Sequence, residues 1–92
     1  MIVRVANDSQ YHLPDEDAGR LNELDNEAVA AVEAGDQTRF AELWQQMLEL
    51  VQRDGRELAD DELVESDVIL PPRDITFDEA KGEFSGDGLI PD

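Results

Sequence analysis

The sequence predicts an α+β fold in which an N-terminal β-hairpin packs on an antiparallel αα-hairpin, followed by an extended C-terminal segment and a short helix. Three observations predict it. Apolar residues alternate at the N-terminus, then recur at helical spacing through two consecutive segments, and a compact apolar run near residue 70 stops at two prolines. With 92 residues and neither a repeat nor a linker, we expect a single domain, residues 1–92.

Two β-strands are expected at the N-terminus. Residues 1–5 alternate around Arg4, and residues 10–13 alternate again. The intervening Asn7-Asp8-Ser9 has side chains suited to a tight turn because they can bond to their own backbone. Since a two-stranded hairpin is marginal by itself, its apolar face needs a cover.

Two helices are expected to provide this cover. Pro14 ends the second strand, and acidic residues 15–17 suit a helix N-terminus. Gly35 is suited to a left-handed cap of the first helix, and Asp36 to the N-cap of the second. Because the loop between the helices is short, they should pack antiparallel. Their apolar faces are Leu21, Leu24, Ala28 and Val32, then Phe40, Leu43, Trp44, Met47, Leu48 and Val51.

The apolar pattern weakens beyond Gly55. The run Val68-Ile69-Leu70, stopped by Pro71 and Pro72, should be an edge strand or an extended segment on the core. A capping box then predicts a short helix that begins after Thr76, because a glutamate follows three residues later. The apolar side of this helix consists of Phe77, Ala80 and Phe84.

The composition excludes several classes of function. The chain carries 24 acidic and seven basic side chains, for a formal net charge of −17, and it has no cysteine. We expect no nucleic-acid partner and no adhesion to anionic lipid, since both surfaces attract cations. No apolar run reaches the roughly 20 residues that span a bilayer, so we expect a cytoplasmic protein without direct membrane insertion. Without cysteine, disulfides and thiolate metal sites are excluded.

The same acidity has two interpretations. A high net charge with modest hydrophobicity is typical of disordered chains. It is also compatible with a folded protein of a salt-rich cytoplasm, because the Debye length at molar salt is only about 3 Å. The phased apolar residues favour the folded, salt-adapted protein, since a disordered chain has no need to keep them in phase.

No catalytic, cofactor-binding or metal-binding residue is expected. His12, the only histidine, lies on a predicted strand with neither a nucleophile nor an orienting group nearby in sequence. Residues 15–19 begin like a calcium-binding loop, but the glycine comes one position early and Asn26 stands where the closing glutamate belongs. A small hydrolase that uses a pair of the carboxylates remains an alternative.

The apolar residues also offer a candidate partner surface. Tryptophan and methionine are enriched at protein interfaces, and a small core can leave apolar surface uncovered. Whether Trp44 belongs to the core instead stays open at this point. The candidate residues are Trp44, Met47 and Val51 on the second helix and Val68 and Leu70 in the extended segment.

Several strings resemble a known family, in the same order over nearly the whole chain. They are residues 1–5, 10–11, 21–26, 34–36, 60–72 and 88–91. Together they resemble the PspAA family of PspA-associated proteins, although the family's first turn tends to contain glycine. With the acidic composition, the resemblance indicates a haloarchaeal-type member.

The resemblance implies a role beside PspA, a coiled-coil protein of the phage-shock, or membrane-stress, response. The chain would then be a non-enzymatic adaptor or regulator that its partner recruits to the membrane periphery. A homodimeric structural protein is the second alternative. The resemblance carries over no functional residues, and it leaves open whether Ser66, Asp67, Pro71 and Pro72 are structural or functional.

Overall fold

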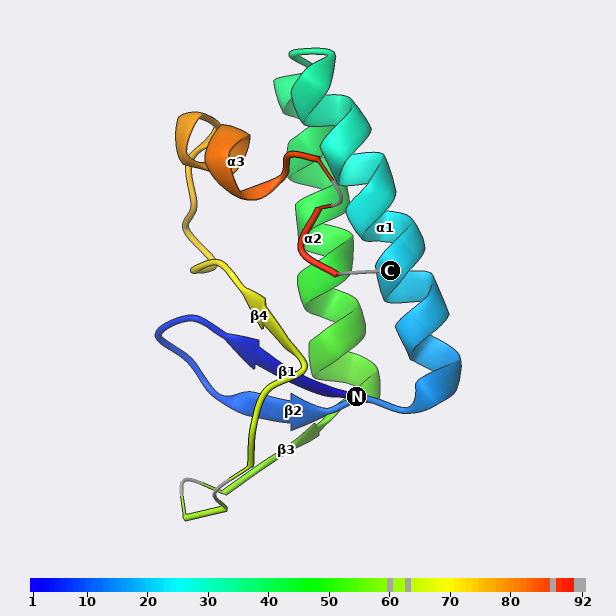
Figure 1. Cartoon of the computed structure of the whole chain (residues 1–92), viewed down its shortest axis with the longest axis vertical. Helices are drawn as coiled ribbons and strands as arrows, with labels where there is room; N and C mark the ends of the chain where they lie inside the picture. The colour runs from blue at the N-terminus through cyan, green and yellow to red at the C-terminus, as the bar shows by residue number, and fades with distance from the viewer. Residues whose placement is uncertain (60, 63, 87, 91–92) are drawn as a thin grey trace.

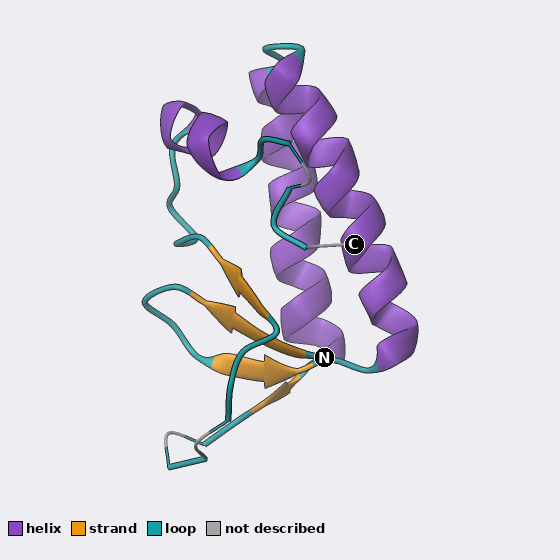
Figure 2. Cartoon of the chain, in the orientation of Figure 1, coloured by secondary structure: helices purple, strands orange, loops and turns teal. Residues whose placement is uncertain are grey.

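The computed structural model describes residues 1–59, 61–62, 64–86 and 88–90, and it has the predicted α+β architecture (Figures 1 and 2). The helices are α1 (Asp15–Glu33), α2 (Gln37–Asp54) and α3 (Phe77–Glu83). The strands are β1 (Ile2–Val5), β2 (Gln10–His12), β3 (Arg56–Glu57) and β4 (Val68–Leu70). They form one mixed sheet in the order β3-β2-β1-β4.

The predicted hairpin and edge strand are both present in the sheet. β1 pairs antiparallel with β2, which places Val3 opposite Tyr11. β4 pairs in parallel with the other side of β1 and forms one edge of the sheet. β3, at the opposite edge, was not predicted because its two exposed residues carry no apolar alternation.

One face of the sheet is apolar and packs toward the helices. Figure 1 shows the sheet beside the lower part of the α1–α2 pair and α3 beside its upper part. The period of two along each strand places alternate side chains on this face. The strand residues and the adjoining leucine that join the core are Val3, Val5, Tyr11, Leu13, Val68 and Leu70.

The two long helices form the predicted antiparallel pair. Gly35 has a φ of 71°, the left-handed conformation expected between them. The Asp36 carboxylate accepts a hydrogen bond from the Arg39 backbone N–H at 3.0 Å and caps α2. Every residue of the two predicted apolar faces is buried. The stripe of α2 therefore belongs to the core.

The third helix covers the upper part of the core. Its first turn has the predicted capping box between Thr76 and Glu79. Phe84 is fully buried, and its ring meets those of Phe40 and Trp44 edge-on, with centroids 5.1 and 5.8 Å away. Such edge-to-face pairs are favourable because the positive ring edge meets the negative ring face.

The described end of the chain returns to α1. Ile90 is buried, and Leu89 packs against the same core. Asp25, on α1, is fully buried and accepts hydrogen bonds from the backbone N–H groups of both residues at 3.0 Å. The Leu89-Ile90 pair is thus docked.

Candidate partner-binding surfaces

The structure places all five candidate partner residues in the core. Trp44 and Val68 are 6% and 3% exposed, and Met47, Val51 and Leu70 are fully buried. The indole Nε1 of Trp44 donates a hydrogen bond to the carbonyl oxygen of Arg73 at 3.2 Å. The sheet and α3 therefore cover most of these side chains, and of the five only Trp44 lines one of the surface pockets that remain open beside α2. Their role as a partner surface stays a prediction.

Two neighbouring surfaces are accessible instead. The first is a groove between α2 and the segment that leads into α3, here called the α2 groove. It has a volume of about 430 Å³. Its lining consists of Gln37, Phe40, Ala41, Trp44, Gln45, Ile75, Thr76 and Phe77. None of these side chains is charged, although 34% of the chain is.

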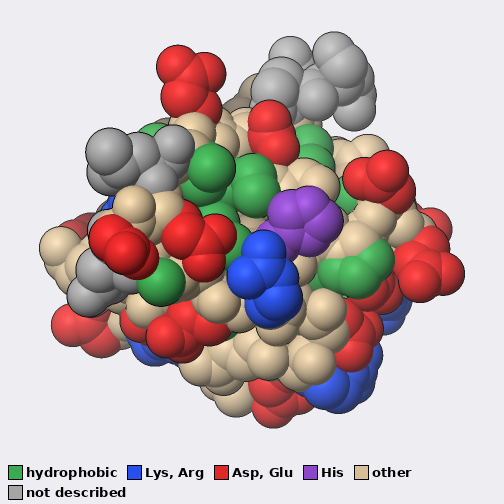
Figure 3. Space-filling view, turned by 90° about the horizontal axis from the view of Figure 1, so that it is seen from below, with side chains coloured by type: hydrophobic (Ala, Val, Ile, Leu, Met, Phe, Trp, Pro, Cys, Tyr) green, Lys and Arg blue, Asp and Glu red, His purple; other side chains and the backbone are tan. Residues whose placement is uncertain are grey.

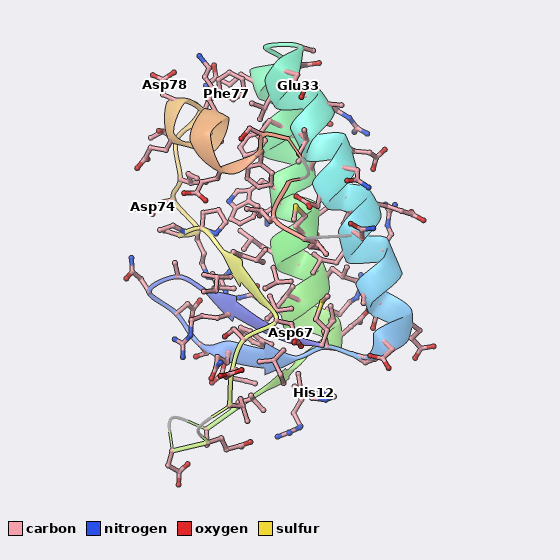
Figure 4. The ribbon with its side chains drawn as sticks, viewed as in Figure 1. His12, Glu33, Asp67, Asp74, Phe77 and Asp78 are labelled. Atoms are coloured by element: carbon pink, nitrogen blue, oxygen red, sulfur yellow. The ribbon has the colours of Figure 1, made fainter. Side chains whose placement is uncertain are left out.

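Aromatic contacts build the walls of the α2 groove. The ring of Phe77 meets Phe40 edge-on with centroids 5.9 Å apart, and Figure 4 shows Phe77 on the side of α3 toward the helix pair. The ammonium of Lys81 lies 5.3 Å from the centroid of the Phe77 ring. Ala41, on the exposed side of α2, leaves the groove open because its side chain is small.

The second surface is the outer face of the sheet, opposite the helices. Ile69 points outward between Val68 and Leu70 and is 61% exposed. Val64, in the segment before β4, is 45% exposed, and these two are the exposed large hydrophobic residues of the described chain. Figure 4 shows His12 pointing away from the helices. In Figure 3, which views this end from below, a basic side chain and hydrophobic side chains adjoin the histidine.

Arg4, on this outer face, differs from the other basic side chains in its ion pairing. Six of the seven basic side chains lie within ion-pair distance of a carboxylate. Arg4 is exposed and has no such partner among residues 1–59, 61–62, 64–86 and 88–90. It lies opposite Ile69 in β4 and opposite Gln10 in β2.

The polar residues before β4 have structural partners. Ser66 Oγ accepts a hydrogen bond from Gln10 Nε2 at 2.7 Å, and Asp67 Oδ2 accepts one from the Ile2 N–H at 2.7 Å. Asp67 also donates its backbone N–H to the Ile2 carbonyl at 2.8 Å. These bonds attach the segment to the hairpin. Pro71 is buried and Pro72 half-buried directly after the strand.

A cavity of about 140 Å³ beside Arg4 brings two carboxylates together, as the hydrolase alternative requires. Asp8 Oδ2 accepts a hydrogen bond from Arg73 Nε at 2.6 Å, which lowers the pKa of Asp8. Glu62 Oε1 lies 3.8 Å from Arg56 Nη1. Because both carboxylates are engaged by arginines and a lowered pKa disfavours a general acid, this cavity gives the alternative no support.

Neither a metal cluster nor a membrane-spanning helix is found in the described part of the chain. Its histidine, aspartate and glutamate residues form no group of three or more that could hold a metal ion. None of its helices is sufficiently long and apolar to cross a bilayer.

The sequence missed the walls of the α2 groove and the outward side of β4. Ile75 and Phe77 come from a segment whose position depends on contacts with α2. A signal for Ile69 was present, because the period of two places it on the face opposite Val68 and Leu70. The interpretation of residues 68–70 as one compact apolar run did not distinguish the exposed Ile69 from its two buried neighbours.

Comparison with known proteins gives one match. A family model described as PspA-Associated protein (PspAA) matches residues 1–92. No curated protein and no solved structure matches the chain.

Proposed function

Because the chain belongs to the PspAA family of PspA-associated proteins, we propose that it is a non-enzymatic adaptor or regulator of a PspA-type coiled-coil protein in membrane-stress response. The match over residues 1–92 is the observation that carries this proposal. The protein would work in the cytoplasm and reach the membrane periphery through its partner. A net charge of −17 supports indirect recruitment, since anionic lipid repels an acidic surface.

The α2 groove is the proposed site for a helix of that partner. An amphipathic helix binds by laying its apolar face into a hydrophobic groove, with anchors at helical spacing. The aromatic floor of Phe40 and Trp44 and the wall of Ile75 and Phe77 suit such anchors. The uncharged rim matters as well, because a buried charge without a partner would weaken the contact.

A substitution at the groove rim tests the proposal. Ala41→Glu places a carboxylate in the uncharged lining, and both its bulk and its charge should oppose an apolar helix. We expect the affinity for the PspA-type protein of the same cell to fall about tenfold or more, a loss of roughly 1.4 kcal/mol. Isothermal titration calorimetry at native ionic strength measures it.

Ala30→Glu is the matched control. Ala30 is likewise an exposed helical alanine, but it lies on α1 and outside the groove lining. It should bind like the parent, and thermal unfolding should show both variants folded. If the parent does not bind the PspA-type protein at any ionic strength, the proposed function is wrong. If the two variants bind equally, the partner does not use the α2 groove.

A further inference from the structure

We infer that the outer face of the sheet around Arg4 is a second docking surface, which binds an acidic segment of the same PspA-type partner. This inference rests on the proposed function and extends it from one contact to two. The segment would present one carboxylate to Arg4 and aliphatic side chains to Ile69 and Val64.

The strand register places the required groups on one face. Arg4 lies between Ile69 on β4 and Gln10 on β2. In the adjacent row, Ile2 is opposite His12, and His12 is opposite Arg56. Because directly opposed residues point to the same side of a sheet, the guanidinium of Arg4 shares this surface with the aliphatic side chain of Ile69.

The charge of the occupant follows from Arg4. In a chain with 24 carboxylates, the described residues leave this one arginine without an ion-pair partner. An acidic segment would supply the missing charge, and complementary charge favours encounter and correct orientation. A basic or neutral segment would gain nothing from Arg4 and would meet the exposed aliphatic residues alone.

The cavity beside Arg4 has room for one inserted side chain. Its volume is about 140 Å³, and polar and aliphatic groups share its wall. Arg73 and Arg56 hold the two carboxylates of this wall, as described above, so Arg4 is the charge that remains for an incoming carboxylate. The remaining lining residues are Ser9, Gln10, Leu58, Ala59 and Val64.

Two other occupants are less compatible with this surface. Two copies of the chain that met face to face about a two-fold axis would bring their Arg4 side chains toward each other. An anionic membrane would satisfy Arg4 but would set an extended anionic surface against a chain with a net charge of −17, whereas a short acidic segment meets only the face around Arg4. The observations therefore favour an acidic segment of a protein partner.

The test measures the dissociation constant for the PspA-type protein of the same cell between 0.1 and 2 M KCl (about 10 and 2 Å Debye length). Arg4→Gln should weaken binding roughly tenfold at the lowest salt concentration and flatten the salt dependence, because it removes a charge pair. Ile69→Asn should weaken binding by a similar factor at every salt concentration. Arg20→Gln, an exposed arginine of α1 that pairs with Glu23, is the control and should change nothing.

The outcomes separate this inference from the proposed function. If Ala41→Glu weakens binding but Arg4→Gln and Ile69→Asn do not, the second surface is wrong and the proposed function stands. If the parent does not bind, both fail. Sedimentation of the parent tests whether a second copy of the chain occupies this face. A dimer that Arg4→Gln or Ile69→Asn dissociates would assign the face to self-association and overturn the inference.

Discussion

Asp25 holds the described end of the chain against α1. Both of its carboxylate oxygens accept the backbone N–H of Leu89 at 3.0 Å, and Oδ2 also accepts that of Ile90 at 3.0 Å. Gly88 packs directly on this carboxylate, since a Cβ there would lie 2.6 Å from Oδ2. A carboxylate buried among apolar side chains is stable only when it is hydrogen-bonded. The contact therefore joins two segments about 64 residues apart.

We predict that Asp25→Ala lowers the free energy of unfolding by about 2–3 kcal/mol, because the buried N–H of Ile90 and the partly buried N–H of Leu89 lose their acceptor. Urea unfolding followed by tryptophan fluorescence measures the change, and Trp44 supplies the signal. An unchanged unfolding midpoint would show that Asp25 does not fasten the segment.

A pair of glycine substitutions provides the control for this prediction. Gly88→Ala combines a positive φ of 80° with the close approach to Asp25. Gly86→Ala has a similar backbone conformation, with a φ of 59°, but nothing within 4 Å of the new methyl group. The first should destabilise more than the second, and equal effects would argue against tight packing on the carboxylate.

α3 shows how a seven-residue helix is maintained. Isolated helices shorter than about 12 residues are marginal in water, so α3 depends on its cap and on packing. The Thr76 backbone N–H donates a hydrogen bond to Glu79 Oε1 at 3.1 Å, and the Glu79 N–H donates one to Thr76 Oγ1 at 3.2 Å. The hydrogen bond from the Thr76 N–H lowers the pKa of Glu79 from its ordinary value of 4.5 because it favours the ionised carboxylate.

We predict that the capping box stabilises α3 in a pH-dependent way. Thr76→Ala should cost about 1 kcal/mol at pH 7 through loss of the N-cap. Glu79→Gln should lower the unfolding midpoint at pH 7, and the difference from the parent should shrink as the pH falls below about 4.5. Because the pKa of Glu79 is lower in the folded state, the carboxylate stabilises the fold fully at pH values above its unfolded-state pKa. This stabilisation is lost as the pH falls and the folded carboxylate gains a proton.

Thermal unfolding of the parent and of Glu79→Gln between pH 3 and 7 measures this effect. Asp78→Asn is a suitable control, because Asp78 lies in the same helical turn, and its ion pair with Lys81 at 3.4 Å is outside the capping box. A difference between parent and Glu79→Gln that stays constant with pH would contradict the assignment of the hydrogen bond to the carboxylate.

At the scale of the whole molecule, like charge dominates the surface. The 24 acidic side chains outnumber the basic ones by more than three to one, so arginine and lysine pairs neutralise only a minority of them. This repulsion acts against the compact state and is weakened by salt. The fold and the charge together support the proposal that the protein works in a salt-rich cytoplasm.

We predict that the free energy of unfolding rises between 0.1 and 2 M KCl. A gain of about 1–2 kcal/mol would raise the melting temperature by roughly 5–15 °C in a domain of this size. Differential scanning calorimetry measures the rise, and a stability that is flat or falls with salt would contradict adaptation to salt.

A variant with fewer charges serves as the control for the salt prediction. Glu16, Glu33, Glu57 and Glu65 are exposed and have no ion pair with another described residue. Changing all four to glutamine reduces the negative charge without removing a described ion pair. This variant should gain less stability from KCl than the parent does.

The sequence by itself determined the fold class, the hairpin, both long helices with their apolar faces, and the capping box of α3. These features depend on local rules: a period of two or 3.6 residues, and caps that act within one turn. For the same reason, the apolar stripe of α2 was visible in the pattern, whereas the extent of its cover by the sheet and α3 was not. The sequence therefore offered Trp44 and Met47 as a surface, although they belong to the core.

Only the tertiary structure decided the features that join distant segments. The Trp44–Arg73 hydrogen bond spans 29 residues, the bonds to Ser66 and Asp67 span 56 and 65, and those to Asp25 span about as many. Such contacts form when packing brings the segments together, and no local period encodes them. The same packing leaves Arg4 without a described ion-pair partner and opens the α2 groove. The proposed binding surfaces therefore depend on how the elements meet, while the sequence determined the elements themselves.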